Sequence, residues 1–261
     1  MHNPHMWFVR EHLSLRVHSA NGHDFQRWKH TPLAEPFWRI YQNDGNSWSI
    51  VHQRRSVHLN PDSLVVAAPG TVFVAHGMVP DRHRYIHFTL DEPHWRVDPG
   101  LYQLPCEAAD RAALACLDQP NDAAPRPSDL AGITGLCLRT LARLPADVIT
   151  IPAHPPAVEQ ALAHLSRYPD RQVPNAELAA LTGMNPNAFI RAFRQAVGET
   201  PQRWHQQQRI DRASMALVHT ADSIDTIAIL HGFCDRNHFT RVFTAQRGVA
   251  PARYRRLARG Q

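Results

Sequence analysis

The sequence lacks the features that mark membrane and secreted proteins. No apolar run approaches the roughly 18 residues of a membrane-spanning helix, although 43% of the 261 residues are hydrophobic. The first residues, Met1 to Val9, lack the basic and then apolar pattern of a signal peptide. We therefore expect a cytoplasmic protein without a membrane partner.

Cysteine is scarce, and the usual catalytic motifs are absent. The four cysteines (Cys106, Cys116, Cys137 and Cys234) lie far apart and form no C-x-x-C pair. This spacing disfavours a disulfide framework or a structural zinc site and predicts reduced thiols. The sequence contains no G-x-S-x-G, P-loop or H-E-x-x-H motif. We expect no catalytic residues, no cofactor and no enzymatic activity.

Lysine is nearly missing, and the basic charge is unevenly distributed. Lys29 is the only lysine, so arginine supplies the other 27 basic residues. Arginine suits the recognition of phosphate and guanine, although GC-rich coding produces the same bias. Residues 1–150 carry 14 basic and 15 acidic side chains, whereas residues 151–261 carry 14 basic and 8 acidic ones. A near-neutral half followed by a basic half indicates a nucleic-acid or anionic partner for the second half.

Short apolar runs separated by turn residues dominate residues 33–97. The runs occupy residues 37–41, 47–51, 64–66, 71–74 and 85–88, with turn clusters such as Asn43-Asp44-Gly45-Asn46 between them. Closely spaced short strands predict an antiparallel sandwich or barrel.

Two helices are predicted after this region, over about residues 107–117 and 128–144. Apolar residues recur at helical spacing in the second, at Leu130, Ile133, Leu136 and onward. The pair either packs on the barrel or leaves an apolar seam for a partner. Prolines 152, 155 and 156 then mark the domain boundary, because proline stiffens a linker and cannot continue a helix. The predicted domains are residues 1–150 and 151–261.

The second domain contains an internal repeat. Ala179, Gly183, Phe189, Arg191, Phe193 and Gly198 recur 49 or 50 residues later as Ala228, Gly232, Phe239, Arg241, Phe243 and Gly248. Such self-similarity indicates two copies of one unit. Each copy is predicted as helix, tight turn, helix, over about residues 175–198 and 223–248, with Asn175, Asn185, Ser223 and Asp235 as helix caps.

Residues 158–254 resemble the DNA-binding domain of AraC/XylS-type transcription regulators. The run that carries this resemblance is Ile227-Ala228, Gly232-Phe233, Phe239, Arg241-Val242-Phe243, Gly248-Val249, Pro251 and Tyr254-Arg255. Upstream, Leu178-Ala179, Gly183-Met184, Phe193, Gly198, Pro201, Arg209 and Ala213 fit the first copy. The resemblance implies seven helices in two subdomains, joined by a connector over about residues 201–219. It also implies that the two recognition helices enter adjacent major grooves about 34 Å apart.

The resemblance also implies which side chains contact double-stranded DNA. The family's base-contacting positions match Asn187, Ile190 and Arg191 in the first copy and Arg236, Asn237 and Arg241 in the second. Arginine can read guanine, asparagine adenine, and isoleucine a thymine methyl group. Arg194 and Thr240 are candidates for phosphate contacts.

The first domain resembles the cupin-like sensory domain of the same family, through residues 38–41, 64–71 and 85–88. An α+β chain is thus expected, with an antiparallel barrel and helical hairpin before an all-α domain. The candidate effector pocket consists of Trp38, Tyr41, His76, Tyr85 and His87. No metal site is expected, since His52, His58, His76, His83, His87 and His94 form no H-x-H motif with a following Glu; only His83 and His87 share a strand face.

The sequence therefore predicts a DNA-binding transcription regulator controlled by a small-molecule effector, with the helical pair as a homodimer contact. Two alternatives stay open. One is a metal-dependent cupin enzyme with a DNA-binding appendage. The other is a ligand-independent regulator whose barrel serves dimerisation or contact with RNA polymerase.

Overall fold

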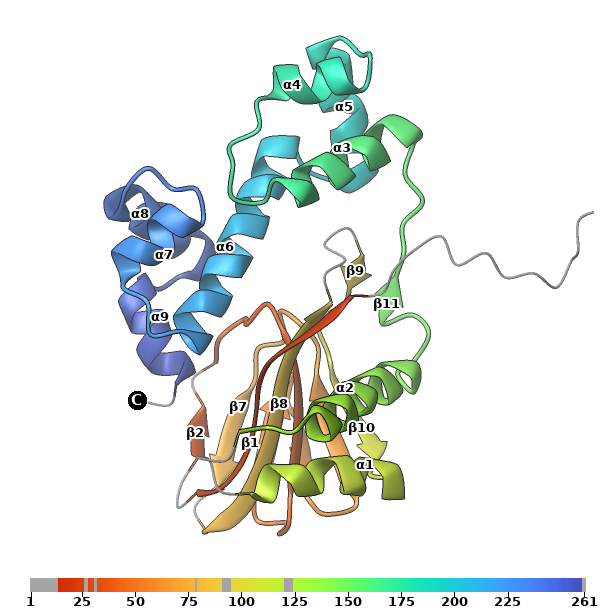
Figure 1. The fold of residues 1–261 in the computed structure, drawn as a ribbon, viewed down its shortest axis with the longest axis vertical. Coiled ribbons are helices and arrows are strands. Elements are labelled where there is room, and N and C mark those ends of the chain that lie inside the picture. The colour runs from red at the N-terminus through yellow and green to blue at the C-terminus, as the bar shows by residue number, and fades with distance from the viewer. Residues whose placement is uncertain are drawn as a thin grey trace, which may run out of the picture.

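The computed structural model describes residues 14–25, 28–30, 32–77, 79–90, 95–119 and 124–259. It contains an N-terminal domain built on antiparallel sheets and a C-terminal domain built of helices (Figure 1). The predicted fold class is therefore confirmed. The segment Met1–Val9 and His94, which entered the sequence arguments, lie outside the described residues. Within those residues no helix is both long and apolar enough to cross a membrane.

Two antiparallel sheets form the body of the N-terminal domain. The five-stranded sheet has the order β1-β8-β3-β6-β10, and the four-stranded sheet has the order β2-β7-β4-β5. Their strands are β1 (Leu15–Phe25), β2 (Trp28–His30), β3 (Trp38–Asn43), β4 (Ser49–His52), β5 (Arg55–His58), β6 (Ser63–Ala67), β7 (Val74–Gly77), β8 (Asp81–Leu90) and β10 (Leu101–Pro105). A separate pair joins β9 (Arg96–Val97) to β11 (Ile149–Thr150). The predicted barrel thus takes the form of two packed sheets.

Strand β3 shows how the five-stranded sheet separates two cores. All six of its residues are buried, as expected of a central strand covered on both faces. Trp38 and Ile40 belong to one hydrophobic cluster, whereas Tyr41 belongs to a second cluster with Trp48 and Phe73. Side chains alternate between the faces of a strand, so neighbouring residues of β3 enter different cores.

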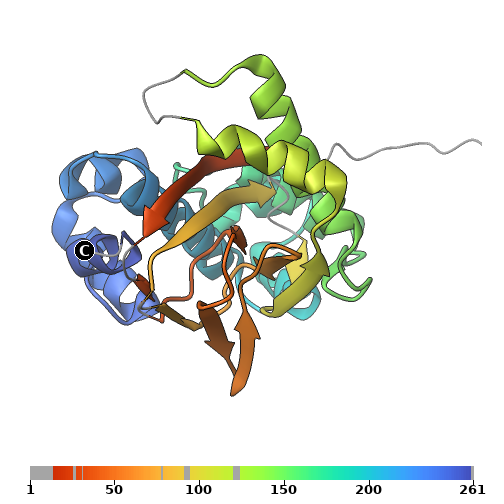
Figure 2. The ribbon, with the colours of Figure 1, turned by 90° about the horizontal axis from the view of Figure 1, so that it is seen from below.

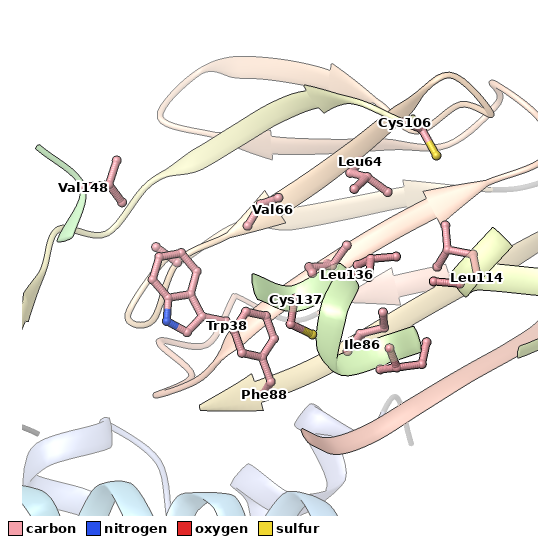
Figure 3. Close-up of a cluster of buried hydrophobic side chains, with 14 residues drawn as sticks. Trp38, Leu64, Val66, Ile86, Phe88, Cys106, Leu114, Leu136, Cys137 and Val148 are labelled. Carbon is pink, nitrogen blue, oxygen red and sulfur yellow. The ribbon is translucent and has the colours of Figure 1, made fainter. Parts of the chain in front are cut away.

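Helices α1 (Ala108–Leu114) and α2 (Pro127–Ala142) cover one face of the five-stranded sheet (Figures 1 and 2). Ile133, Leu136 and Cys137 of α2 are buried against strand residues such as Ile86 and Phe88 (Figure 3). On the same helix Leu130 and Leu138 remain 55% and 39% exposed. The helix therefore packs on the sheet and also presents apolar side chains outward. This arrangement is compatible with both interpretations of the helical pair, as a cover for the sheet and as an apolar contact for a partner.

Strand β1 was not predicted from the sequence, and β7 begins later than predicted. β1 contains Asn21, Gly22 and Asp24, which have low strand propensity, and its extended conformation depends on pairing with β8 over nearly its whole length. Gly22 is also required sterically, because a Cβ atom there would lie 2.6 Å from the Leu117 carbonyl oxygen. The run predicted over residues 71–74 begins instead at Val74, because Thr71 is engaged in hydrogen bonds with Gly100.

Seven helices make up the described part of the C-terminal domain. They are α3 (Pro156–Arg167), α4 (Asn175–Leu181), α5 (Pro186–Val197), α6 (Pro201–His219), α7 (Ile224–Leu230), α8 (Arg236–Arg247) and α9 (Pro251–Ala258). Figure 1 shows α6 running between a group formed by α3, α4 and α5 and a group formed by α7, α8 and α9.

The segment between β2 and β3 anchors the two domains to each other. Leu33 is 5% exposed and packs in the hydrophobic cluster of α6, α7, α8 and α9. Next to it, the Arg247 guanidinium donates to the Ala34 carbonyl oxygen at 3.4 Å. Glu35 is held in turn by a buried ion pair with Arg39 of β3. The N-terminal domain therefore supplies part of the core of the second helical group.

A cluster of aromatic rings lies beside this anchor. His219, the last residue of α6, stacks on His18 with ring centroids 5.4 Å apart and lies 5.2 Å from Phe37 and 5.4 Å from His87. Burial lowers the pKa of His219 to about 4, with a smaller lowering by His18 and Arg259 and an opposing effect of Glu35. Its Nε2 atom is buried without a hydrogen-bond partner. The interface therefore favours a neutral His219.

This cluster predicts a pH-dependent domain contact. When the contact opens, His219 regains its ordinary pKa near 6.5, so protonation favours the open or unfolded state as the pH falls from about 6.5 to 4. We expect His219→Phe, which keeps an aromatic ring, to lose less stability than the wild type over this range. Chemical denaturation at pH 7 and pH 5 measures the difference. Both proteins retain the buried His83 and His205, so identical pH dependence would contradict the role assigned to His219.

Candidate DNA-binding interface

The two helix-turn-helix units have the same turn geometry. In the first, the Met184 amide donates to the Ala179 carbonyl at 2.9 Å, and in the second the Phe233 amide donates to the Ala228 carbonyl at 3.0 Å. These pairs are five residues apart, as in a Schellman C-cap. Gly183 and Gly232 provide the required left-handed backbone with φ of +66° and +73°. The sequence repeat is thus a structural repeat.

The second helix of each unit begins at a capped residue. The Asn185 side chain accepts a hydrogen bond from the Asn187 amide at 3.0 Å, with Pro186 in the first turn. The Asp235 side chain accepts from the His238 amide at 2.7 Å. Ser223 likewise caps α7. These predicted caps are confirmed, but Asn175 is not a cap: it is the first helical residue of α4, and Pro174 takes the cap position with extended dihedrals.

Helix α6 joins the two units through their cores. Near its start, Trp204 is 6% exposed and packs with Phe189 and Phe193. Further along, Ile210 and Leu217 are fully buried with the cluster that contains Phe239 and Phe243. Because one continuous helix contributes to both cores, neither unit can rotate about it without disrupting its own packing. The orientation of the two recognition helices, α5 and α8, is thereby restrained.

A second connection reinforces α6. The loop after α3 approaches the turn of the second unit so closely that a Cβ atom on Gly232 would lie 1.9 Å from the Asp170 carbonyl oxygen. Arg209 of α6, 5% exposed, donates to the Gly232 carbonyl at 2.8 Å and stacks over Phe233. His205 Nε2 lies 3.1 Å from the Tyr168 carbonyl oxygen. Polar contacts thus tie the first unit to the turn of the second.

Helix α5 presents polar side chains away from the core of the first unit. Phe189 and Phe193 are fully buried, whereas Asn187, Arg191 and Arg194 are exposed. Within the described part of the chain, neither arginine side chain of α5 makes a hydrogen bond or an ion pair. Ile190 is half-buried and packs against the core. Of the four residues predicted on this helix, Ile190 therefore has the least surface to offer a ligand.

Helix α8 has the same organisation. Arg236, Asn237 and Arg241 are exposed, and Thr240 is half-buried. The Arg236 guanidinium donates to the Asp225 carboxylate at 3.1 Å, in a pair whose side chains are 56% and 63% exposed. The sequence did not predict a role for Asp225. It lies in the first turn of α7, 11 residues before its partner, and no local pattern predicts that pairing.

The five residues predicted for an effector pocket do not lie together. Tyr41, Tyr85 and His87 are neighbours, with ring centroids 4.8 Å apart for Tyr85 and His87 and 6.4 Å apart for Tyr41 and His87. Trp38 points to the opposite face of the five-stranded sheet, where it stacks on Phe88. His76 is exposed on β7 of the other sheet. A pocket made of all five is therefore a prediction that this geometry does not favour.

The histidines of β8 are part of the packing of the N-terminal domain. His83 is 2% exposed, its Nδ1 lies 2.7 Å from the Asn43 Oδ1, and burial lowers its pKa to about 3. Its ring stacks with Tyr41 and Trp48. His87 instead faces the domain interface beside His219. Among the residues that the structure describes, no group of three or more His, Cys, Asp or Glu could hold a metal ion.

Comparison with known proteins matches this architecture. A family described as a helix-turn-helix domain matches residues 178–257. The chain is 31% identical over 106 residues to the arabinose operon regulatory protein of Escherichia coli, covering 39% of this chain and 36% of that protein. It is 31% identical over 94 residues to the transcriptional activator RhaS of Klebsiella pneumoniae, covering 36% and 34%. In this region the chain is therefore similar to AraC/XylS-type regulators.

The fold of the chain as a whole is similar to that of ToxT from Vibrio cholerae. A ToxT structure with a bound unsaturated fatty acid aligns with a TM-score of 0.55 and 15% identity, covering 92% of this chain and 95% of ToxT. Another ToxT structure, bound to (E)-4-(8-methylnaphthalen-1-yl)but-3-enoic acid, has the same TM-score. At this identity the likeness concerns the fold. This chain spans only about a third of the length of the two sequence relatives named above.

The turn glycines predict unequal effects of the same substitution. Gly183→Ala places a side chain on a left-handed residue, and this backbone strain should lower the free energy of unfolding by roughly 1–2 kcal/mol. No collision adds to this cost, because the new Cβ would meet nothing within 4 Å. Gly232→Ala adds a collision with the backbone of Asp170, which should cost about 1–3 kcal/mol more. Denaturant unfolding of the two variants measures this difference. Equal losses would contradict the close approach of the two units.

Proposed function

We propose that this chain is a sequence-specific DNA-binding transcription regulator controlled by a small-molecule effector held by its N-terminal domain. The observation that carries the proposal is the duplicated helix-turn-helix unit on one shared helix. Each unit exposes arginine and asparagine on its second helix, the element that enters the major groove in such motifs. The named AraC/XylS relatives are regulators, which supports this reading. Such a protein acts on DNA in the cytoplasm.

The proposal assigns base contacts to Asn187, Ile190 and Arg191 in α5 and to Arg236, Asn237 and Arg241 in α8. Arg194 and Thr240 contact phosphates. The arginine side chains of α5 and Arg241 have no competing ion pair in the described structure, so their donors are available to DNA. Two recognition helices in adjacent grooves then read two segments on one face of the duplex.

Effector control and self-association complete the proposal. ToxT, whose fold this chain shares, has been observed with bound carboxylic acids, which supports a ligand-binding role for the N-terminal domain. The exposed Leu130 and Leu138 on α2 support a homodimer through this helix. Contact with RNA polymerase, by which a DNA-bound regulator acts on transcription, belongs to the same proposal.

The test begins with selection of bound sequences from a random duplex library by the full chain. Arg191→Ala, Arg236→Ala and Arg241→Ala are then titrated on the selected sequence. Each should lose about 1–3 kcal/mol of binding free energy and relax the preference at one base pair. Arg253→Ala, on α9 and equally exposed, is the control and should leave the preferred sequence unchanged. Unaltered affinity and preference in Arg236→Ala and Arg241→Ala would contradict the assignment.

Asp225 provides a separate prediction. Its carboxylate holds the Arg236 guanidinium, and an exposed pair of this kind contributes at most about 1 kcal/mol to stability. Asp225→Asn should therefore fold normally and bind random DNA more tightly, because a negative charge is removed. At the base pair that Arg236 reads, the Asp225→Asn variant should nevertheless discriminate less between the right base and the wrong ones. Asp222→Asn, whose carboxylate accepts from Thr220, is the matched control and should keep full discrimination. A matching loss in this control would contradict a positioning role for Asp225.

A further inference from the structure

The turns of the two helix-turn-helix units match in sequence and differ in their surroundings. A Cβ atom on Gly183, in the first turn, would meet nothing within 4 Å. The same atom on Gly232, in the second turn, would lie 1.9 Å from the Asp170 carbonyl oxygen. Asp170 belongs to the loop between α3 and α4 and therefore to the first helical group. The second turn is thus packed against the first group, whereas the first turn is open.

Side chains from two elements hold the second turn in this position. Arg209 of α6 is 5% exposed, donates to the Gly232 carbonyl oxygen at 2.8 Å and lies over the Phe233 ring, 5.0 Å from its centroid. Asp170 Oδ1 lies 3.3 Å from Nδ1 of His231, the residue before Gly232. These contacts of Arg209 and Asp170 with His231, Gly232 and Phe233 form what we call the inter-unit clamp.

Arg209 occupies this place at a cost in stability. Its Nε atom is buried without a hydrogen-bond partner. Burial also lowers the pKa of its guanidinium, against an opposing effect of Asp170. Native structures rarely keep an unsatisfied buried donor, least of all on a charged group, without a reason. The cost indicates that Arg209 has a role beyond stabilising the fold.

The clamp acts on the stretch of α6 that lies between the two hydrophobic cores. Trp204 packs in the first core and Ile210 in the second, about 9 Å apart along the helix axis. Between them only His205 and Arg209 are buried, and the three glutamines 206–208 are partly exposed. His205 Nε2 lies 3.1 Å from a backbone carbonyl oxygen of the loop after α3, which runs beside α6 (Figure 1). This stretch therefore packs on the loop and not on a core.

A shift of the second turn would move α8 with it. The Phe233 amide donates to the Ala228 carbonyl at 3.0 Å, which closes the turn, and α8 begins at Arg236, four residues after Gly232. On the other side, the loop after α3 leads into α4 and from there into α5. The clamp thus connects the two recognition helices by a route separate from α6.

We propose that Arg209 and Asp170 are positioning residues that set the spacing between the two DNA segments read by α5 and α8. The inference rests on the proposed function, because the spacing is defined on DNA that both helices read. One added base pair displaces the second segment by about 3.4 Å along the duplex and by about 35° around it. With the clamp closed, α8 cannot follow this displacement; with the clamp broken, α6 can bend between its two cores and α8 can follow.

The test uses the selected duplex with one base pair inserted or deleted midway between its two segments. The wild-type full chain should bind the altered duplexes about 30-fold more weakly than the original, because one segment is then misread. Arg209→Met should narrow this penalty to about threefold and keep the base preference within each segment. Asp170→Ala, at a side chain that is 47% exposed, should fold normally and change the penalty in the same direction.

Leu217→Ala is the control for a general loss of stability. Leu217 is fully buried in the core of the second unit and takes no part in the clamp. This variant should be less stable than the wild type and keep the full spacing penalty. Unchanged penalties in both Arg209→Met and Asp170→Ala would overturn the proposal. An equal relaxation in Leu217→Ala, or a wild type that tolerates every spacing, would also overturn it.

A measurement without DNA separates failure of this inference from failure of the proposed function. Nitroxide labels at Gln195→Cys on α5 and Ala245→Cys on α8, both exposed positions, report the distance between the recognition helices by pulsed electron resonance. Cys116→Ser and Cys234→Ser remove the cysteines that are not buried. We expect one narrow distance distribution, broadened by Arg209→Met. Equal widths would overturn the clamp, whereas this broadening in a chain that binds no DNA would refute the proposed function alone.

Discussion

The arrangement of the C-terminal domain depends on one helix that belongs to two hydrophobic cores. α6 spans Pro201–His219, about 28 Å at 1.5 Å per residue. Trp204 completes the core of the first helix-turn-helix unit, and Ile210, Ala213 and Leu217 complete that of the second. Each unit alone is too small to bury its apolar side chains, so sharing a helix stabilises both units and also fixes their separation. The contacts of Arg209 and Asp170 with Gly232 remove the remaining freedom of rotation.

The N-terminal domain acts on this arrangement at two places. On one side, Leu33 enters the core of the second unit and His219 closes an aromatic cluster with His18, Phe37 and His87. On the other, a cavity between the domains separates the sheet from α3 and α6. The first contact holds the domains together, and the second leaves room between them. The cavity is lined by residues of β1, β8, α3 and α6, so it lies beside the helix that the two helix-turn-helix units share.

Local signals made much of this structure predictable. The helix caps and turn glycines act within a few residues of their own position, and the repeat at an offset of 49 or 50 residues shows these signals twice. The helices that begin at the caps Asn185, Ser223 and Asp235 were predicted correctly. Long-range interactions were not predictable in the same way. β1 is extended only because β8 pairs with it, the place of Leu33 in a distant core has no sequence signature, and Asp225 meets Arg236 only after the turn has formed. The effector residues were inferred from residue type alone, and the fold places Trp38 and His76 away from the other three.

The central claim is that two recognition helices, held at a fixed separation, read adjacent major grooves. Hydroxyl-radical footprinting of the full chain on its selected DNA tests it most directly. The account predicts two protected segments on one face of the duplex, separated by about one helical turn of 10–10.5 base pairs, with the same separation on every selected sequence. A single protected segment, or a separation that varies from one sequence to another, would contradict it.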